Sequence, residues 1–137
     1  FLDLREVLEG FIIRNAVVSI TDQQIQQLSD LLVHMKELMD QRDLLAYSQC
    51  NQEFHNIIYS ACTNRTAVEM TIKLKNQMRK YNSKTILVPG RDVSSYEEHK
   101  KILQVIQARD PESAELAMRL HIRNVRDTFQ TNYSLLF

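Results

Sequence analysis

The stretch Cys-Asn-Gln-Glu-Phe-His-Asn-Ile-Ile, residues 50–58, sets the pattern from which we interpret the rest of the chain. Asn51 and His55 are four residues apart, so on a helix they lie on one face, one turn apart. That face is otherwise apolar, with members at helical spacing: Leu44, Tyr47, Phe54, Ile58 and Cys62. An unpaired buried polar group costs about 1–3 kcal/mol, so this helix needs partners for an imidazole and a carboxamide inside the domain.

Composition favours one all-α domain. A chain of 137 residues is ample for a single core, and it holds only two glycines and two prolines to interrupt helices. The 17 basic and 17 acidic residues balance, which excludes a strong electrostatic footprint for nucleic acid or an anionic membrane on this domain. The cysteines form no redox or zinc motif, and no apolar run is long enough to span a bilayer, as expected for a cytoplasmic protein without a membrane partner.

The periodicity predicts a compact antiparallel bundle of about six helices. Their starts are marked by N-cap residues, including a Thr21–Gln24 capping box and a second one at Ser94–Glu97. A loop is expected between residues 82 and 92, where Pro89-Gly90 signals a turn. The expected helices are 2–18, 22 to about 40 after Thr21, 44–62 after Asp43, 65–81 after Asn64, 94 to about 109, and 112 to at least 131 after Asp110-Pro111.

The first helix carries both an apolar stripe and an ion pair. The stripe predicted to face inward is Leu4, Val7, Leu8, Phe11, Ile12 and Ala16. Arg5 and Glu9 lie beside it, four residues apart, and we interpret them as a surface ion pair. The alternative is that Arg5 leans into a pocket as a carboxylate clamp.

The helix 65–81 has a basic face, which we interpret as solvated. A docking surface for another domain or for acidic groups is the alternative. Its residues are Arg65, Lys73, Lys75, Arg79, Lys80 and Lys84.

Three histidines occupy equivalent places on different helices. Like His55, His99 and His121 lie in the middle of apolar stripes, whereas His34 lies at a stripe margin and is expected to be exposed. A single such histidine is more often a core residue bonded to a carbonyl than a ligand. Three of them on facing helices could share Zn²⁺, Ni²⁺ or another borderline divalent ion, and both interpretations remain open from spacing alone.

Five segments, in this order along the chain, resemble a known family. They are Asp3–Gly10, Asn51-x-x-Phe54-His55, Glu98–Leu103, Ala108–Ala114 and Met118-x-x-His121. Over nearly the whole chain the sequence resembles the FCD domain, the C-terminal, effector-binding domain of FadR-type regulators in the GntR family.

The resemblance implies an all-α bundle that forms a homodimer and binds a small organic acid in a central cavity. In many members it implies a divalent metal held by an aspartate and three histidines. Carried over by position, the metal ligands are Asn51, His55, His99 and His121. Asn51 replaces the aspartate, and a neutral amide oxygen is the weaker donor, so metal affinity should fall or depend more on an anionic effector.

Two residues are predicted to bind the effector. Arg5 matches the arginine of the family's first helix, and Tyr96 lies on the inner face of the helix that carries His99.

We therefore expect residues 1–137 to be one ligand-sensing and dimerisation domain of a bacterial transcriptional regulator. DNA would be bound only by an N-terminal winged helix outside this sequence, which lacks an initiator methionine. A metal-free dimerisation module is one alternative. A metal-dependent enzyme is a weaker one, because Glu53 should point away from His55 and Glu98 is expected to be a neighbour that does not face inward.

Overall fold

The computed structural model describes residues 2–136, with all side chains except those of residues 2 and 81–83. This part of the chain is all-α, as predicted, and contains no strand. The expected helix 65–81 divides at Met78, so the bundle has one more helix than the six expected. The helices are α1 (Leu2–Ser19), α2 (Asp22–Asp40), α3 (Leu44–Ala61), α4 (Arg65–Gln77), α5 (Arg79–Thr85), α6 (Arg91–Gln107) and α7 (Pro111–Leu136).

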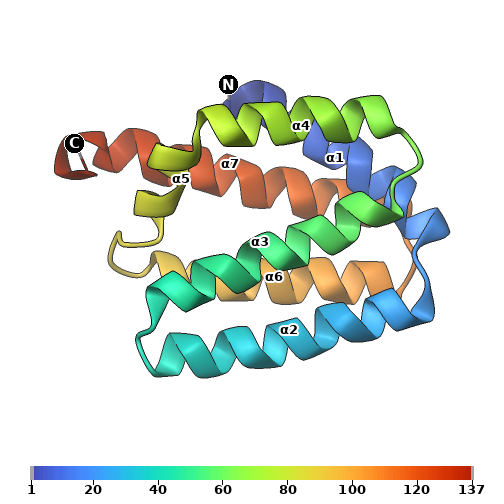
Figure 1. Ribbon diagram of the computed structural model, residues 1–137, viewed down its shortest axis with the longest axis horizontal. Helices are drawn as coiled ribbons and strands as arrows, with labels where there is room; N and C mark the ends of the chain where they lie inside the picture. Colours follow the sequence, from blue (N-terminus) through green and yellow to red (C-terminus); the bar gives the residue numbers. More distant parts are fainter. Residues whose placement is uncertain (1, 137) are drawn as a thin grey trace.

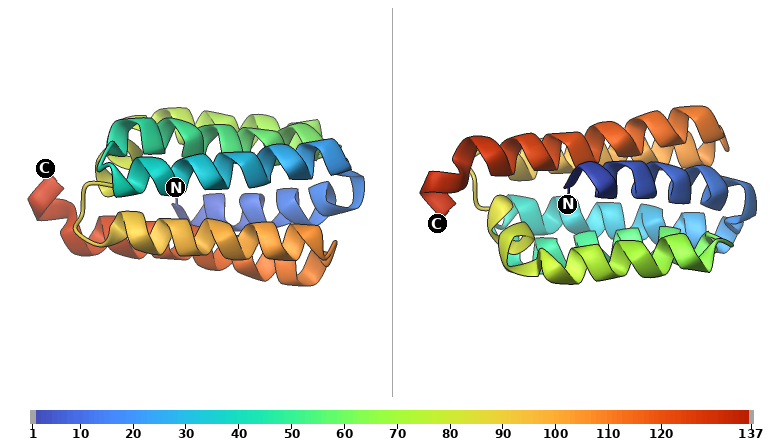
Figure 2. Two further views of the ribbon diagram at one scale, coloured as in Figure 1. Left: turned by 90° about the horizontal axis from the view of Figure 1, so that it is seen from below. Right: turned by 90° about the horizontal axis from the view of Figure 1, so that it is seen from above.

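The long helices run side by side along one axis (Figure 1). Helix α3 packs against α1 and α2, and α7 packs against α1 and α6. Figure 2 shows α1 lying between α7 and α4 when the bundle is viewed from above. The inner sides of α3, α6 and α7 thus share one core, which is where the three predicted histidine positions lie.

Helix starts follow the predicted caps. The Thr21 hydroxyl accepts from the backbone N–H of Gln24 at 3.1 Å, and the Gln24 side chain accepts from the Thr21 N–H at 2.9 Å. Asp43 and Asn64 cap α3 and α4 in the same way, each accepting from the backbone three residues on. Such caps contribute about 1 kcal/mol each and fix where each helix begins.

The capping box predicted at Ser94 is wrong, because α6 starts three residues earlier, at Arg91. Gly90 precedes it with φ of 84°, a left-handed conformation that favours glycine. Ion pairs of two buried side chains stabilise this earlier start: Asp92 accepts from the exposed Arg42 at 2.6 Å, and Arg91 pairs with Glu98. The predicted loop shrinks to residues 86–90, and Arg91 is carried into the core.

The predicted inward face of α1 is also partly wrong. Ile12 and Ala16 are buried, but Leu4, Val7 and Phe11 are about half exposed, at 47%, 51% and 46%. Helix α1 lies between α4 and α7 (Figure 2), and its buried side chains include Arg5 and Glu9 instead. The helix therefore buries an ion pair and leaves an apolar stripe on the surface.

No helix in the described part of the chain is long and apolar enough to cross a membrane.

Candidate metal and effector site

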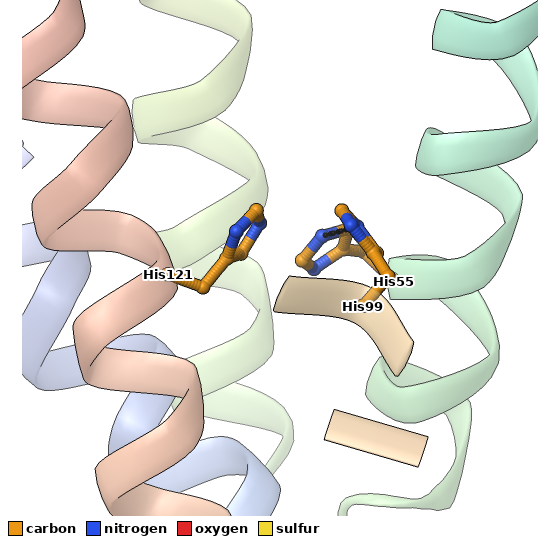
Figure 3. A group of neighbouring side chains, drawn as sticks. All are labelled: His55, His99 and His121. Atoms are coloured by element: carbon orange, nitrogen blue, oxygen red, sulfur yellow. Dashed lines mark hydrogen bonds between the residues drawn. The ribbon is translucent and has the colours of Figure 1, made fainter. Parts of the chain in front are cut away.

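The three inward histidines meet at one point in the core. His55 comes from α3, His99 from α6 and His121 from α7, and all three are buried (Figure 3). One ring nitrogen of each lies within 4.8 Å of those of the other two. His34 is exposed, as predicted. The histidines are therefore clustered, and the alternative of scattered core histidines is excluded.

Hydrogen bonds hold two of the rings so that Nε2 is free for the cluster. His99 Nδ1 lies 2.6 Å from the backbone carbonyl of Ser95, and His121 Nδ1 lies 2.6 Å from a carboxylate oxygen of Glu98. Both acceptors require a proton on Nδ1, which leaves a lone pair on Nε2. Outer hydrogen bonds of this kind orient histidine ligands in metal sites.

Glu98 was expected to lie outside the site, and that expectation is wrong. Its two oxygens accept from His121, from both terminal nitrogens of Arg91 at 2.9 and 2.7 Å, and from Asn124 at 2.9 Å. Burial alone would raise the pKa of Glu98, but the hydrogen bonds from His121 and Arg91 lower it to about 2. Glu98 is thus a permanent anion that orients His121.

The third ring, that of His55, is less completely held. Its Nε2 lies 3.2 Å from Nε2 of His99, and since His99 carries its proton on Nδ1, His55 must be the donor. That leaves Nδ1 of His55 without a hydrogen-bond partner, 3.7 Å from a Glu9 oxygen. As a metal ligand, His55 would carry its proton on Nδ1, facing Glu9.

Two buried side-chain atoms among the described residues lack a partner, and both belong to the predicted ligand set. They are Nδ1 of His55 and Oδ1 of Asn51. An orphaned buried oxygen costs free energy unless something coordinates it. Three imidazoles and one amide oxygen make a donor set suited to a borderline divalent ion, so these residues fit a metal.

The protonation state of the three histidines also suits metal binding. Burial lowers the pKa of His55 and His99 to about 3 and that of His121 to about 4. All three rings are therefore neutral at physiological pH, and the neutral imidazole is the form that binds a metal. The cluster could hold a divalent ion without first losing a proton to solvent.

A cavity of about 430 Å³ opens beside the cluster and is lined by Asn51, His55 and His121. Its wall carries four basic side chains, Arg5, Lys75, Arg79 and Arg91, and no acidic one among the described residues. Besides Asn51 and Tyr59, the uncharged polar side chains in the wall are Ser48, Gln52, Asn56, Asn76, Thr85 and Ser95. The cavity is thus positively charged and rich in hydrogen-bonding groups.

Tyr96 does not reach this cavity. Successive residues of a helix are about 100° apart, and α6 turns Ser95 and His99 toward the site. Tyr96 is half-buried and packs against the hydrophobic core instead. Ser95 occupies the cavity position that was predicted for Tyr96. It lines the cavity and accepts from the Tyr47 hydroxyl at 2.9 Å.

Arg5 and Glu9 do not form a surface ion pair. Both are buried, and Arg5 Nε donates to Glu9 at 2.7 Å. The Tyr59 hydroxyl donates to the other Glu9 oxygen at 2.5 Å. Burial would raise the pKa of Glu9, but the adjacent charge of Arg5 holds it well below its usual range. Arg5 lines the cavity, as the clamp interpretation requires.

Lys75 departs from the solvated face predicted for residues 65–84. It is half-buried, lines the cavity and donates to the Tyr59 hydroxyl at 3.1 Å, whereas Arg65 and Lys73 are exposed. Periodicity placed Lys75 on a basic face but could not show that this face covers a cavity.

A comparison of the chain with known protein families gives a match. Residues 1–124 match the FCD domain. The chain belongs to the FCD domain family. The match covers α1 to α6 and about the first half of α7, and it confirms the resemblance seen in the sequence.

Similar proteins include transcriptional repressors. This FCD domain is 25% identical over 134 residues to the HTH-type transcriptional repressor NanR of Cronobacter sakazakii, covering 95% of the chain and 50% of that protein. It is 27% identical to the repressors of the same name from Salmonella newport and Salmonella arizonae, with 94% of the chain matched in each case. The chain spans about half the length of these relatives.

Proposed function

We propose that this FCD domain senses a small organic acid through a bound divalent metal and controls a DNA-binding winged helix N-terminal to it in a cytoplasmic regulator. The observation that carries the proposal is a buried cluster of three neutral histidines beside a cavity walled by cations. The similarity of the chain to transcriptional repressors supports a regulatory role. A sensor requires only that the effector bind one arrangement of the protein better than another.

His55, His99, His121 and Asn51 would hold the metal. A divalent ion bound there would supply positive charge and open positions for a carboxylate oxygen of the effector. Zn²⁺ or Ni²⁺ suits the nitrogen-rich donor set. Arg5 supplies a guanidinium in the cavity wall that can pair with the same carboxylate.

The wall also favours a polar effector. An alkyl chain in the cavity would displace water from amide side chains such as Gln52, Asn56 and Asn76 and would offer them no hydrogen bonds in return. An acid that carries hydroxyl groups would return their hydrogen bonds.

An enzymatic role has less support, because neither carboxylate beside the cluster is free to act as a general base. Glu98 is occupied by His121, Arg91 and Asn124, and Glu9 by Arg5 and Tyr59. Neither carboxylate can take a proton easily, since the pKa of each lies below its usual range.

We expect at least one hydroxylated acid among L-lactate, L-malate, citrate, D-gluconate and D-glucuronate to raise the melting temperature of the metal-loaded domain. Binding at a hundred times the dissociation constant adds about 2.7 kcal/mol of stability, a shift of several degrees. D-Glucitol, which has hydroxyls without a carboxylate, and hexanoate, which has a carboxylate without hydroxyls, are the matched controls. A melting curve that none of the acids moves would contradict effector sensing.

We also propose that the domain dimerises through the exposed apolar stripe of α1, defined by Leu4, Val7 and Phe11. Each of these side chains is about half exposed, and they follow one face of the helix at spacings of three and four. A continuous apolar face of this kind is typical of an interface rather than of a monomer's surface. A symmetric pair of α1 helices would cover it.

Phe11→Glu should convert the dimer to a monomer with little change in thermal stability of the fold. The substitution puts a charge within the stripe, where a desolvated unpaired charge costs several kcal/mol. Light scattering coupled to size-exclusion chromatography would measure the mass. Val33→Glu, at a side chain of α2 that is 60% exposed, is the control and should leave the mass unchanged. A Phe11→Glu protein that stays dimeric would place the interface elsewhere.

A further inference from the structure

Lys75 differs from the other cations of the cavity wall. Arg5 and Arg91 each have a carboxylate partner, Glu9 and Glu98. Arg79 is exposed to solvent. Lys75 is half-buried, and no carboxylate oxygen of the described residues lies within 4.0 Å of its ammonium nitrogen. A partly desolvated ammonium that touches no carboxylate is unfavourable unless an anion completes its surroundings.

The contacts of Lys75 connect it to the buried ion pair. Its Nζ donates to the Tyr59 hydroxyl at 3.1 Å and lies 4.9 Å from the centre of the Tyr59 ring. Tyr59 in turn donates to Glu9, which also accepts from Arg5. Lys75, Tyr59, Glu9 and Arg5 thus form one chain of hydrogen bonds in the cavity wall.

The charges of this chain do not balance. Arg5 and Lys75 contribute two positive charges, and Glu9 contributes one negative charge, which leaves one positive charge in excess. Burial lowers the pKa of Lys75 to about 8, so the excess charge is present at neutral pH. One monovalent anion beside Lys75 would neutralise this chain, apart from the charge of a metal held by the histidines.

We propose that Lys75 is a specificity-determining residue whose ammonium pairs with the carboxylate of the effector, completing a cluster of two cations and two anions with Arg5 and Glu9. This inference rests on the proposed function, since it identifies the residue that selects an acid over an uncharged analogue. Lysine has three N–H donors, and Tyr59 takes one of them, so donors remain for a ligand in the cavity.

Lys75 also gives a cleaner test than Arg5. Removing Arg5 would leave the carboxylate of Glu9 buried without its cation, so an Arg5 variant would change the stability of the fold as well as the affinity for the effector. Removing the charge of Lys75 strands no carboxylate. Lys75→Gln removes the charge and keeps an N–H donor, on a side chain one bond shorter than that of lysine.

The experiment compares Lys75→Gln, Lys75→Arg and Lys73→Gln by titration calorimetry in the metal-loaded domain. Lys73 lies two residues away on the same helix and is exposed. The probe is whichever of L-lactate, L-malate, citrate, D-gluconate and D-glucuronate binds the unaltered domain. Charged hydrogen bonds are worth about 1.5–3 kcal/mol, so Lys75→Gln should weaken binding about tenfold to hundredfold. Lys75→Arg and Lys73→Gln should bind within about fivefold of the unaltered domain, a change under about 1 kcal/mol.

A second readout separates binding from folding. Zn²⁺ affinity without any carboxylate should be unchanged in Lys75→Gln, which shows that the site is intact. If the unaltered domain binds an acid and Lys75→Gln binds it equally well, the inference is overturned while acid sensing stands. If the unaltered domain binds none of the five acids, acid sensing fails and this inference fails with it. Should Lys75→Gln not fold, Lys75→Met is measured against the same criteria.

Discussion

His99→Ala is expected to purify with less than about 0.1 metal ion per chain, whereas the unaltered FCD domain should retain close to one. The substitution removes one of three imidazole donors and leaves two nitrogens and the neutral oxygen of Asn51. Changing an outer hydrogen-bond partner of a metal ligand typically costs about 10- to 100-fold in affinity, and losing a ligand should cost more. Elemental analysis of protein purified without chelator or polyhistidine tag measures the content, and competition with a chelating dye measures the affinity.

Two further variants make that result specific. His34→Ala removes an exposed histidine of α2 and should leave the metal content unchanged. Asn51→Asp replaces a neutral donor with a carboxylate and should raise affinity for Zn²⁺ by about tenfold, roughly 1.4 kcal/mol. An unaltered domain that carries less than about 0.1 metal per chain, with no response to His99→Ala or to added Zn²⁺, would favour the metal-free dimerisation module.

The histidine cluster could be predicted because its residues obey helical periodicity. His55, His99 and His121 each lie mid-stripe, and short antiparallel connections force the inner faces of α3, α6 and α7 together. Caps at Thr21, Asp43 and Asn64 set the helix starts from local hydrogen bonds alone. Local rules therefore yield the fold and the centre of the site.

The sequence could not show how α1 is rotated. This helix has two candidate faces, one with Leu4, Val7 and Phe11 and one with Arg5 and Glu9. Periodicity favours the apolar face as the inner one, but the face with the ion pair is buried because the Tyr59 hydroxyl donates to Glu9 and Lys75 donates in turn to Tyr59. Tyr59 is 50 residues from Glu9 in sequence and Lys75 is farther, so no local pattern could reveal them.

Glu98 and Tyr96 were misplaced for a related reason. Each is within three residues of His99, so a rotation of about 100° decides whether a side chain meets α7, the cavity or the core. Only the packing of α6 on α7 shows that Glu98 reaches His121. Buried polar contacts between helices are set by tertiary structure, and they form most of the site that sequence reasoning missed.

Glu9 is the carboxylate on which the buried cations depend. It is 1% exposed and accepts from Arg5 and Tyr59, and it lies 3.7 Å from His55. Without its charge, the Arg5 guanidinium would be buried with no counter-ion and Lys75 would be its neighbour. Removing one partner of a buried pair is strongly destabilising because the remaining charge stays desolvated, whereas replacing both partners with apolar residues is often neutral.

Glu9→Gln should therefore lower the free energy of unfolding by about 3–5 kcal/mol, which for a domain of this size lowers the melting temperature by about 10–15 °C. Urea denaturation followed by circular dichroism measures the change, with metal removed so that folding alone is compared. Glu53→Gln, at an exposed position of α3, should cost less than about 0.5 kcal/mol. The double variant Arg5→Met/Glu9→Leu should recover most of the loss, because it leaves no charge stranded between them. A Glu9→Gln protein within about 1 kcal/mol of the unaltered domain would mean that solvent in the cavity, and not Glu9, compensates the charge of Arg5.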